Sequence, residues 1–241
     1  EGGERRGGSN IVYKGRRRSW LVTLKCREFT STTEEFPSGE LKRWKAGDYG
    51  ILENSDASTY LKKLLVEKAK KRPNYFFGEA WIVACVRPHV EGVYGSFDWL
   101  TGENRSRSSR SKPRSWHEKE YKKQLDKYVP FLDELQLEAG KMKVPGIGVS
   151  SDKKKRKKLS PSVPDLWLID SEERHHFIEA KIHPGDEANQ QQVAGLALIA
   201  RHFVEHGMSV STEVLTLYEK GSKPPSQDVE KTYCNWYEEA R

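Results

Sequence analysis

The segment Pro164–Ile182, with the sequence PDLWLIDSEERHHFIEAKI, decides the fold. It contains two apolar runs, Leu166–Ile169 and His176–Ile182, on either side of the polar turn Ser171–Arg174. Apolar runs separated by a short polar stretch are typical of paired strands. We therefore predict a β-hairpin here and interpret the flanking sequence outward from it.

The sequence around this hairpin predicts a mixed α/β sheet. Apolar residues at helical spacing predict a helix over Trp116–Leu137, which Pro130 should kink or split. A strand, an amphipathic helix and a last strand are expected at Val144–Val149, Ala188–Val204 and Glu213–Tyr218. The order helix, three strands, helix, strand indicates an α/β sandwich of αβββαβ type with helices flanking the sheet.

The first half of the chain is interpreted as an N-terminal α+β region. A basic amphipathic helix is expected over Ser58–Lys71, with Ser55 or Ser58 as its N-cap. The remaining expectations are a turn-rich stretch at Glu34–Asp48 and three strands at Trp20–Leu24, Phe76–Val86 and Tyr94–Leu100.

These patterns divide the chain into five parts. The boundary between the halves is placed at a basic stretch that has almost no apolar residues. The parts are a flexible tail at 1–10, a substrate-positioning or nucleic-acid-binding region at 11–104, a basic linker at 105–114, a catalytic core at 115–220 and an extension at 221–241.

Composition excludes several classes of protein. The 241 residues contain no apolar run of the ~20 residues that a bilayer span requires, so a membrane protein is not expected. The polar first ten residues do not resemble a secretory signal, and Cys26, Cys85 and Cys234 are too few for a disulfide framework. We expect an intracellular location, cytoplasmic or, in a eukaryote, nuclear.

The charge pattern favours a polyanionic partner. Lys and Arg number 42 against 35 Asp and Glu, which gives a net charge of +7. The most basic run is Lys153, Lys154, Lys155, Arg156, Lys157 and Lys158. This run, which lies a few residues before Asp165, indicates phosphate contacts or a nuclear localisation signal. An ordinary solvated loop is the simpler alternative.

Two carboxylates and an amine should meet on the predicted hairpin. Alternation places Glu179 and Lys181 on one face of their strand, and hairpin pairing brings Asp165 up to them. Carboxylate oxygens suit Mg²⁺, and the carbonyl of Ala180 could add a ligand. Lys181 could orient or deprotonate an attacking water or offset negative charge in the transition state. The simpler alternative is an exposed ladder of ion pairs.

Asp165, Glu179 and Lys181 resemble the PD-(D/E)XK nuclease motif, and Pro164–Phe203 resembles its VRR-NUC branch, with Gly185-Asp186 and then the run Gln190-Gln191-Gln192. The resemblance covers roughly residues 115 to 220 and implies a restriction-endonuclease-like core. It implies that Asp165 and Glu179 are metal ligands and that Lys181 is the catalytic lysine.

Two further residues enter through this resemblance. The first core helix of the superfamily often contributes an acidic residue, for which Glu118 is the candidate. Gln192 best matches the family glutamine because it shares a helix face with Leu196 and Ile199. The chain departs from the family at Ile182-His183-Pro184, which stands where small residues usually follow the lysine.

Other aromatic residues and histidines have weaker assignments. His175 and His176 fit a strand-start or substrate-contact role better than a metal site. The N-terminal half vaguely resembles β-barrel readers of the PUA/EVE type through Trp44-Lys-Ala-Gly-Asp48 and Gly78-Glu-Ala-Trp-Ile-Val83. Candidate nucleic-acid contacts in that half are Trp20, Arg27, Trp44 and Tyr75.

The sequence therefore predicts a Mg²⁺-dependent endonuclease that hydrolyses DNA in restriction, transposition or repair, with Mn²⁺ as a substitute ion. A homodimer would suit double-strand cutting. The alternatives are an RNA-cleaving nuclease of the same superfamily, a catalytically silent nucleic-acid binder and a protein-interaction scaffold.

Overall fold

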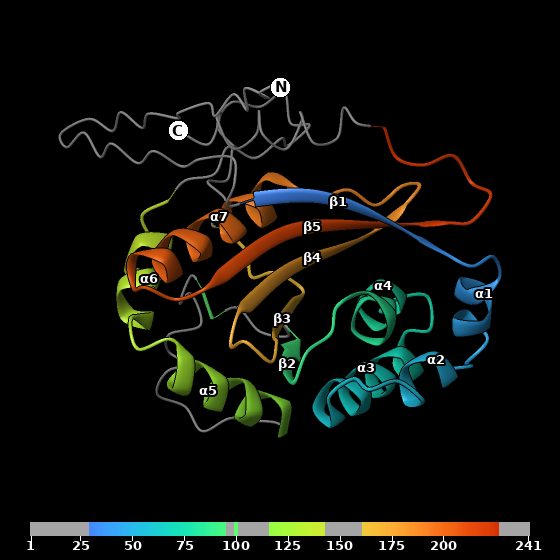
Figure 1. Ribbon diagram of the computed structural model, residues 1–241, viewed down its shortest axis with the longest axis horizontal. Helices are drawn as coiled ribbons and strands as arrows, with labels where there is room; N and C mark the ends of the chain where they lie inside the picture. Colours follow the sequence, from blue (N-terminus) through green and yellow to red (C-terminus); the bar gives the residue numbers. More distant parts are fainter. Residues whose placement is uncertain (1–28, 95–98, 101–115, 143–160, 227–241) are drawn as a thin grey trace, which may run out of the picture.

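The computed structural model describes residues 29–94, 99–100, 116–142 and 161–226. Its centre is a five-stranded sheet in the order β1-β5-β4-β3-β2 (Figure 1). The strands are β1 (Phe29–Phe36), β2 (Glu91–Tyr94), β3 (Leu166–Ile169), β4 (His175–His183) and β5 (Val210–Glu219). β2, β3 and β4 pair antiparallel, whereas β4, β5 and β1 are parallel. The architecture is therefore the expected mixed α/β type.

The helices gather in two groups around this sheet (Figure 1). The first group is α1 (Glu40–Lys45), α2 (Gly50–Glu53), α3 (Thr59–Lys71), α4 (Phe77–Trp81) and the π-helical turn Ile82–Val86. The second group is α5 (Trp116–Tyr128), α6 (Leu132–Ala139) and α7 (Gln190–Glu205).

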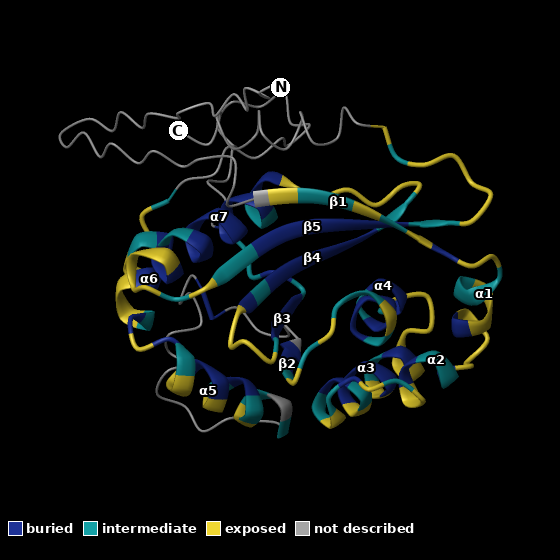
Figure 2. Ribbon diagram, in the orientation of Figure 1, coloured by how far each residue is buried: buried dark blue, intermediate teal, exposed yellow. Residues whose placement is uncertain are grey.

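Successive side chains of β3 point to opposite faces of the sheet, which explains why helices cover both faces. Leu166 and Leu168 belong to the apolar cluster that includes α1 to α4, whereas Trp167 and Ile169 belong to the cluster of α5 to α7. Figure 2 shows the middle strands almost wholly buried. A strand buried on both faces reads as a continuous apolar run, as β3 does.

Several predicted elements are confirmed. Helix α3 begins after Ser58, whose side chain accepts a hydrogen bond from the backbone N–H of Leu61, as expected of an N-cap. α5 and α6 are separate helices on either side of Pro130, which has no N–H to continue the first one. The hairpin β3–β4 turns at the predicted residues, with Leu166 opposite Ile178.

The prediction of a strand over Phe76–Val86 was wrong, because this segment forms α4 and the π-helical turn. Its helix begins after Phe76, which adopts a left-handed φ of 69°. Most of the segment is buried, so it lacks the polar face that would have revealed a helical period. Of the strand expected at Tyr94–Leu100, Tyr94 is the last residue of β2 and residues 99–100 are not in a strand, whereas residues 95–98 lie outside the described part of the chain. The strands expected at Trp20–Leu24 and Val144–Val149 lie outside the described residues.

The sheet takes strands from both sides of the predicted boundary at 105–114. β1 and β2 come from the first half, and they pair with β5 and β3 from the second. One apolar cluster likewise joins Leu61 and Trp81 to Leu166 and Leu215. The boundary thus divides one sheet, two of whose strands precede residues 115–220. Within that range the first strand of the expected αβββαβ order, Val144–Val149, lies outside the described residues.

Candidate active site

Asp165 and Glu179 face one another across the start of the β3–β4 hairpin. Pairing of Leu166 with Ile178 places Asp165 just before one strand of the pair and Glu179 just after the other. The backbone N–H of Ala180 donates to Oδ2 of Asp165 over 3.1 Å. The predicted convergence of these two residues is therefore present in the structure.

Lys181 lies on the same side of β4 as Glu179. Its Nζ is 2.8 Å from Oε1 of Glu179, and the two side chains are almost completely buried, with 8% and 0% of their surfaces exposed. Nζ also lies 3.6 Å from Oδ1 of Asp186 in the loop after β4. An exposed ladder of ion pairs does not describe this arrangement, because charges removed from water require close partners.

Gln192 connects helix α7 to the same carboxylate. Its Nε2 donates to Oε1 of Glu179, while its own Oε1 accepts from the backbone N–H of Asn189 over 2.9 Å. Asn189 in turn accepts from Gln191 N and Gln192 N, which completes a capping box at the start of α7. The glutamine chosen from the sequence is therefore the one that contacts Glu179.

The second oxygen of Glu179 has a different environment. Lys181 and Gln192 both bind Oε1, whereas Oε2 is buried and has no hydrogen-bond partner among the described residues. Buried carboxylate oxygens are normally satisfied. This atom is thus an acceptor available to a cation or a water.

Glu79 is a member of this constellation that the sequence analysis did not find. It lies on α4, which packs against β4 so closely that a Cβ on Gly78 would lie 3.6 Å from Cβ of Ala180. Burial, and then the charge of Asp165, raises the pKa of Glu79 to about 8, while Lys181 acts in the opposite direction. The available signal was an acidic residue inside the apolar run 76–86.

Glu118 has a different position. It is half-buried in the first turn of α5, a helix that packs against β2. The helical carboxylate whose charge is coupled to Asp165 is Glu79. The assignment of Glu118 to the site remains a prediction from the sequence.

The pKa values indicate an excess of negative charge. Burial raises the pKa of Asp165, against the effect of the Lys181 charge, and burial followed by the charge of Asp165 raises that of Glu179 well above its usual range. Burial lowers the pKa of Lys181, but the charges of Glu179 and Asp165 raise it by more than burial lowers it, so the net shift is upward. The charges of Glu179, Asp165 and Asp186 all act on the one ammonium group of Lys181, so acidic groups outnumber it, an environment that favours a further cation.

The oxygen ligands at this site fit a Mg²⁺ ion that keeps most of its coordinated waters. Asp165, Glu179 and the carbonyl of Ala180 could hold the ion, which usually keeps several waters and takes one or two carboxylates from protein. Among the residues that the structure describes, no three or more His, Cys, Asp or Glu side chains form a metal-binding group. The fit therefore depends on the two hairpin carboxylates and the unpartnered Oε2 of Glu179.

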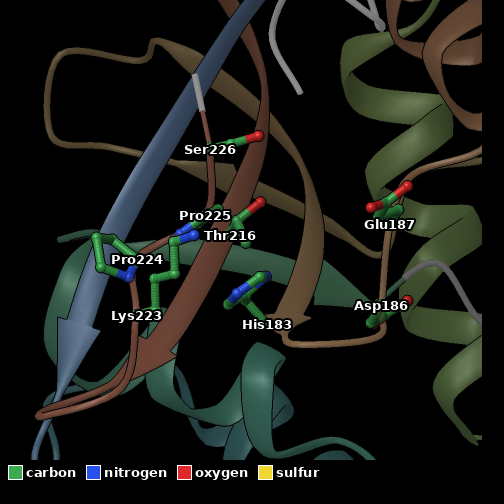
Figure 3. Close-up of a pocket in the computed structure, with 8 residues that line it drawn as sticks. All are labelled: His183, Asp186, Glu187, Thr216, Lys223, Pro224, Pro225 and Ser226. Atoms are coloured by element: carbon green, nitrogen blue, oxygen red, sulfur yellow. The ribbon is translucent and has the colours of Figure 1, made fainter. Parts of the chain in front are cut away.

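A cavity of about 180 Å³ is lined by residues from the end of β4, the loop that follows it, and β5 (Figure 3). Asp186 lines it and also contacts the Lys181 ammonium, and Thr216 lines it from β5 at the position paired with Lys181. Its remaining lining residues are His183, Glu187, Lys223, Pro224, Pro225 and Ser226. The cavity offers room for substrate groups next to Asp186.

The histidine pair belongs to the other end of β4. Nδ1 of His175 accepts a hydrogen bond from Trp167 Nε1 over 3.0 Å in the core. Nε2 of His176 is 2.8 Å from Asp170, and its Nδ1 is 2.7 Å from the hydroxyl of Ser211. Both rings thus serve strand packing, in line with the strand-start role.

The proposed nucleic-acid contacts have mixed outcomes. Trp44 is a core residue with 1% of its surface exposed, so a contact by its ring was a wrong prediction, whereas Tyr75 is 62% exposed. Trp20, Arg27 and the six basic residues Lys153, Lys154, Lys155, Arg156, Lys157 and Lys158 lie outside the described residues.

Comparison with known proteins identifies no relative, because no family model, curated protein or solved structure matches the chain. A separate search of the described helices finds none that is both long and apolar enough to cross a bilayer.

Proposed function

We propose that this protein is a Mg²⁺-dependent endonuclease that hydrolyses phosphodiester bonds in DNA. The observation that carries the proposal is the buried Glu179, which has one oxygen held by Lys181 and Gln192. Its other oxygen has no hydrogen-bond partner among the residues that the structure describes. Buried ionisable groups with strongly shifted pKa values are characteristic of functional sites.

Each residue has a role that follows from its position. Asp165 and Glu179 would hold the ion, which when bound lowers the pKa of water and polarises a phosphate oxygen. Lys181, whose pKa is raised, keeps its proton and places positive charge where the phosphate gains negative charge. This environment favours charge stabilisation and water orientation by Lys181 over proton abstraction.

Glu79 and Gln192 support these groups. Gln192 fixes the Glu179 carboxylate through Oε1, so that Oε2 keeps one direction. Glu79 takes the place that the PD-(D/E)XK resemblance gave to Glu118, as the acidic residue contributed by a helix before the catalytic strands. The restriction-endonuclease-like assignment of the core is part of the same proposal.

The cleavage test uses the full chain with supercoiled DNA, linear DNA, single-stranded DNA and RNA in Mg²⁺, Mn²⁺ or EDTA. Glu179→Gln and Lys181→Met preserve the approximate side-chain size, and Glu172→Gln on the exposed turn is the matched control. We expect metal-dependent cleavage that both site variants lose and the control retains. Cleavage of RNA alone would assign the RNA-cleaving alternative, and sedimentation of the protein on DNA tests the proposed dimer.

A second measurement does not depend on cleavage. Mg²⁺ that binds the folded state should raise the melting temperature of the wild-type chain and not that of Glu179→Gln. Nucleic-acid binding without cleavage of any substrate and without a Mg²⁺ shift would contradict the proposal and favour the catalytically silent binder.

A further inference from the structure

The end of α3 and the loop into α4 form a cationic edge, which we define as Lys68, Lys70, Lys71, Arg72 and Tyr75. Four of these residues are exposed, and Lys68 is half-buried. The Tyr75 ring has 62% of its surface exposed. Within the described part of the chain, no ion pair joins Lys70, Lys71 or Arg72 to a carboxylate.

Several other basic residues of the described chain have acidic partners. Lys122 lies 2.7 Å from Asp126 on α5, and Arg87 is bound to Glu213 through two nitrogens at 2.8 Å. Lys70, Lys71 and Arg72 differ from Lys122 and Arg87 because no ion pair among the described residues neutralises their charge. Phosphate groups are suitable partners for such charge.

The mutual repulsion of this edge is visible at Lys68. Burial lowers the pKa of this lysine, and the charges of Lys71 and Arg72 lower it further. Cations near a helix C-terminus are favoured by the helix dipole, which accounts for the last-turn lysines of α3. The dipole does not account for an exposed aromatic ring in the loop that follows.

The loop holds Tyr75 in place by backbone contacts. Its N–H donates to the carbonyl of Arg72 over 3.0 Å, and its own carbonyl accepts from Trp44 Nε1, also over 3.0 Å. Phe76 follows in a left-handed conformation, and its carbonyl accepts from Ala80 N in the first turn of α4. Tyr75 is thus an exposed ring on a fixed backbone.

The edge adjoins the candidate active site through α4. The negative charge of Glu79 acts on Lys68, and Glu79 is itself coupled to Asp165. Figure 1 shows α3 and α4 together on one side of the sheet, and the two helices are in contact. α4 in turn contacts β4, the strand that carries Glu179 and Lys181, so one short helix connects this edge to the strand of the site.

We propose that the cationic edge holds the backbone of a DNA strand entering the site, and that Tyr75 stacks on an unpaired base. Single-stranded or locally opened DNA is then the preferred substrate. Aromatic rings flanked by cations bind single strands in this way, because every base has a stacking face. This inference rests on the proposed function and names its substrate form.

The test measures binding by fluorescence anisotropy, with a labelled single-stranded oligonucleotide and its blunt duplex in EDTA over a range of salt. Tyr75→Ala should weaken single-strand binding about 10-fold and duplex binding much less, whereas Tyr75→Phe retains binding. The double variant Lys71→Ala/Arg72→Ala should weaken both and reduce the salt slope by about 1 to 2. Lys42→Ala/Lys45→Ala on α1 is the matched control, and melting temperatures verify folding.

This inference would be overturned if the edge variants bound DNA as tightly as the wild-type chain, or if the α1 control lost as much binding as they did. It would also be overturned if the wild-type chain bound neither the single strand nor the duplex. A loss on the duplex equal to that on the single strand would overturn the assignment of Tyr75 to stacking. The cleavage assay separates the two proposals. If the wild-type chain cleaves DNA and the edge variants bind it normally, only the proposed role of the edge is refuted. If the edge variants bind less tightly but the wild-type chain cleaves no substrate, only the nuclease proposal is refuted.

Discussion

Gly195 in α7 lies directly against the backbone of Ser162, because a Cβ at position 195 would stand 1.8 Å from the Ser162 carbonyl oxygen. The N–H of Ser162 also donates to the carbonyl of Gln191 over 2.9 Å. The chain from Ser162 to Asp165 is thus positioned by one surface of α7, whose first turn also provides Gln192.

Gly195→Ala should therefore push this chain away from α7 and move Asp165. Overpacking typically costs about 1 to 3 kcal/mol of stability, and misplacement of a reacting group reduces rates by up to about 100-fold. Urea unfolding and cleavage rates check both expectations. Gly140→Ala is the control because its nearest neighbour would be 3.4 Å away. Equal effects of the two variants would contradict this role of Gly195.

Glu79→Gln distinguishes the helical carboxylate found in the structure from the one chosen from the sequence. The variant keeps the shape of the side chain, but it cannot supply the negative charge that Glu79, whose pKa is raised to about 8, would gain when a bound cation favours loss of its proton. We therefore expect about a 10- to 100-fold loss of cleavage. Its stability in EDTA at pH 7 should change little, since the carboxyl group that glutamine replaces is already mostly neutral there. Glu118→Gln, measured in parallel, should lose less; a larger loss there would restore the assignment made from the sequence.

Gln192→Glu separates two functions of one side chain. A glutamate can still accept from Asn189 N in the capping box, but it cannot donate to Glu179 and it adds negative charge. We expect cleavage to fall about 10- to 100-fold with little loss of helix content by circular dichroism. Gln191→Glu in the same turn supplies the comparison. If both variants cleaved equally, Gln192 would have only its capping role.

His175 makes the stability of the fold sensitive to acid. Burial lowers its pKa to about 4, below the value of about 6.5 in an unfolded chain. The unfolded state therefore takes up the proton first, so this contribution to stability is complete above pH 6.5 and declines as the pH falls toward 4. The expected loss is about 2 kcal/mol.

Urea unfolding at pH 7 and pH 4.5 measures this loss, with His175→Gln as the non-titrating comparison. Glutamine can still accept from Trp167 Nε1 but has no proton to gain in this range. The wild-type chain should lose about 2 kcal/mol more than the variant between the two pH values. Parallel pH profiles would exclude His175 as the cause.

The hairpin and the residues on it could be predicted because their signals are local. A polar turn between two apolar runs fixes the register, and the register alone brings Asp165 opposite Glu179. The family resemblance implied a glutamine on this helix, and helical spacing selected Gln192 from the run of three because it lies one turn before Leu196. In each case the deciding partners are close in sequence.

Glu79 could not be placed by the same reasoning. Its helix is short and mostly buried, so its apolar run has the composition of a strand. Asp165, whose charge acts on Glu79, follows only after a long intervening segment, and no local pattern encodes an interaction over that distance. The same cause hid the role of β2, which joins β3 from across that segment.

The position of β1 at the edge of the sheet has a consequence for synthesis. Thr30 on β1 contacts Thr212 on β5, 182 residues later, and β5 is the neighbouring strand of β1. At about 5 to 20 residues per second, a ribosome needs on the order of ten seconds or more to supply that partner. We therefore expect β1 in nascent chains stalled before β5 to be open to proteases, and to become protected only once residues 210–219 have left the exit tunnel.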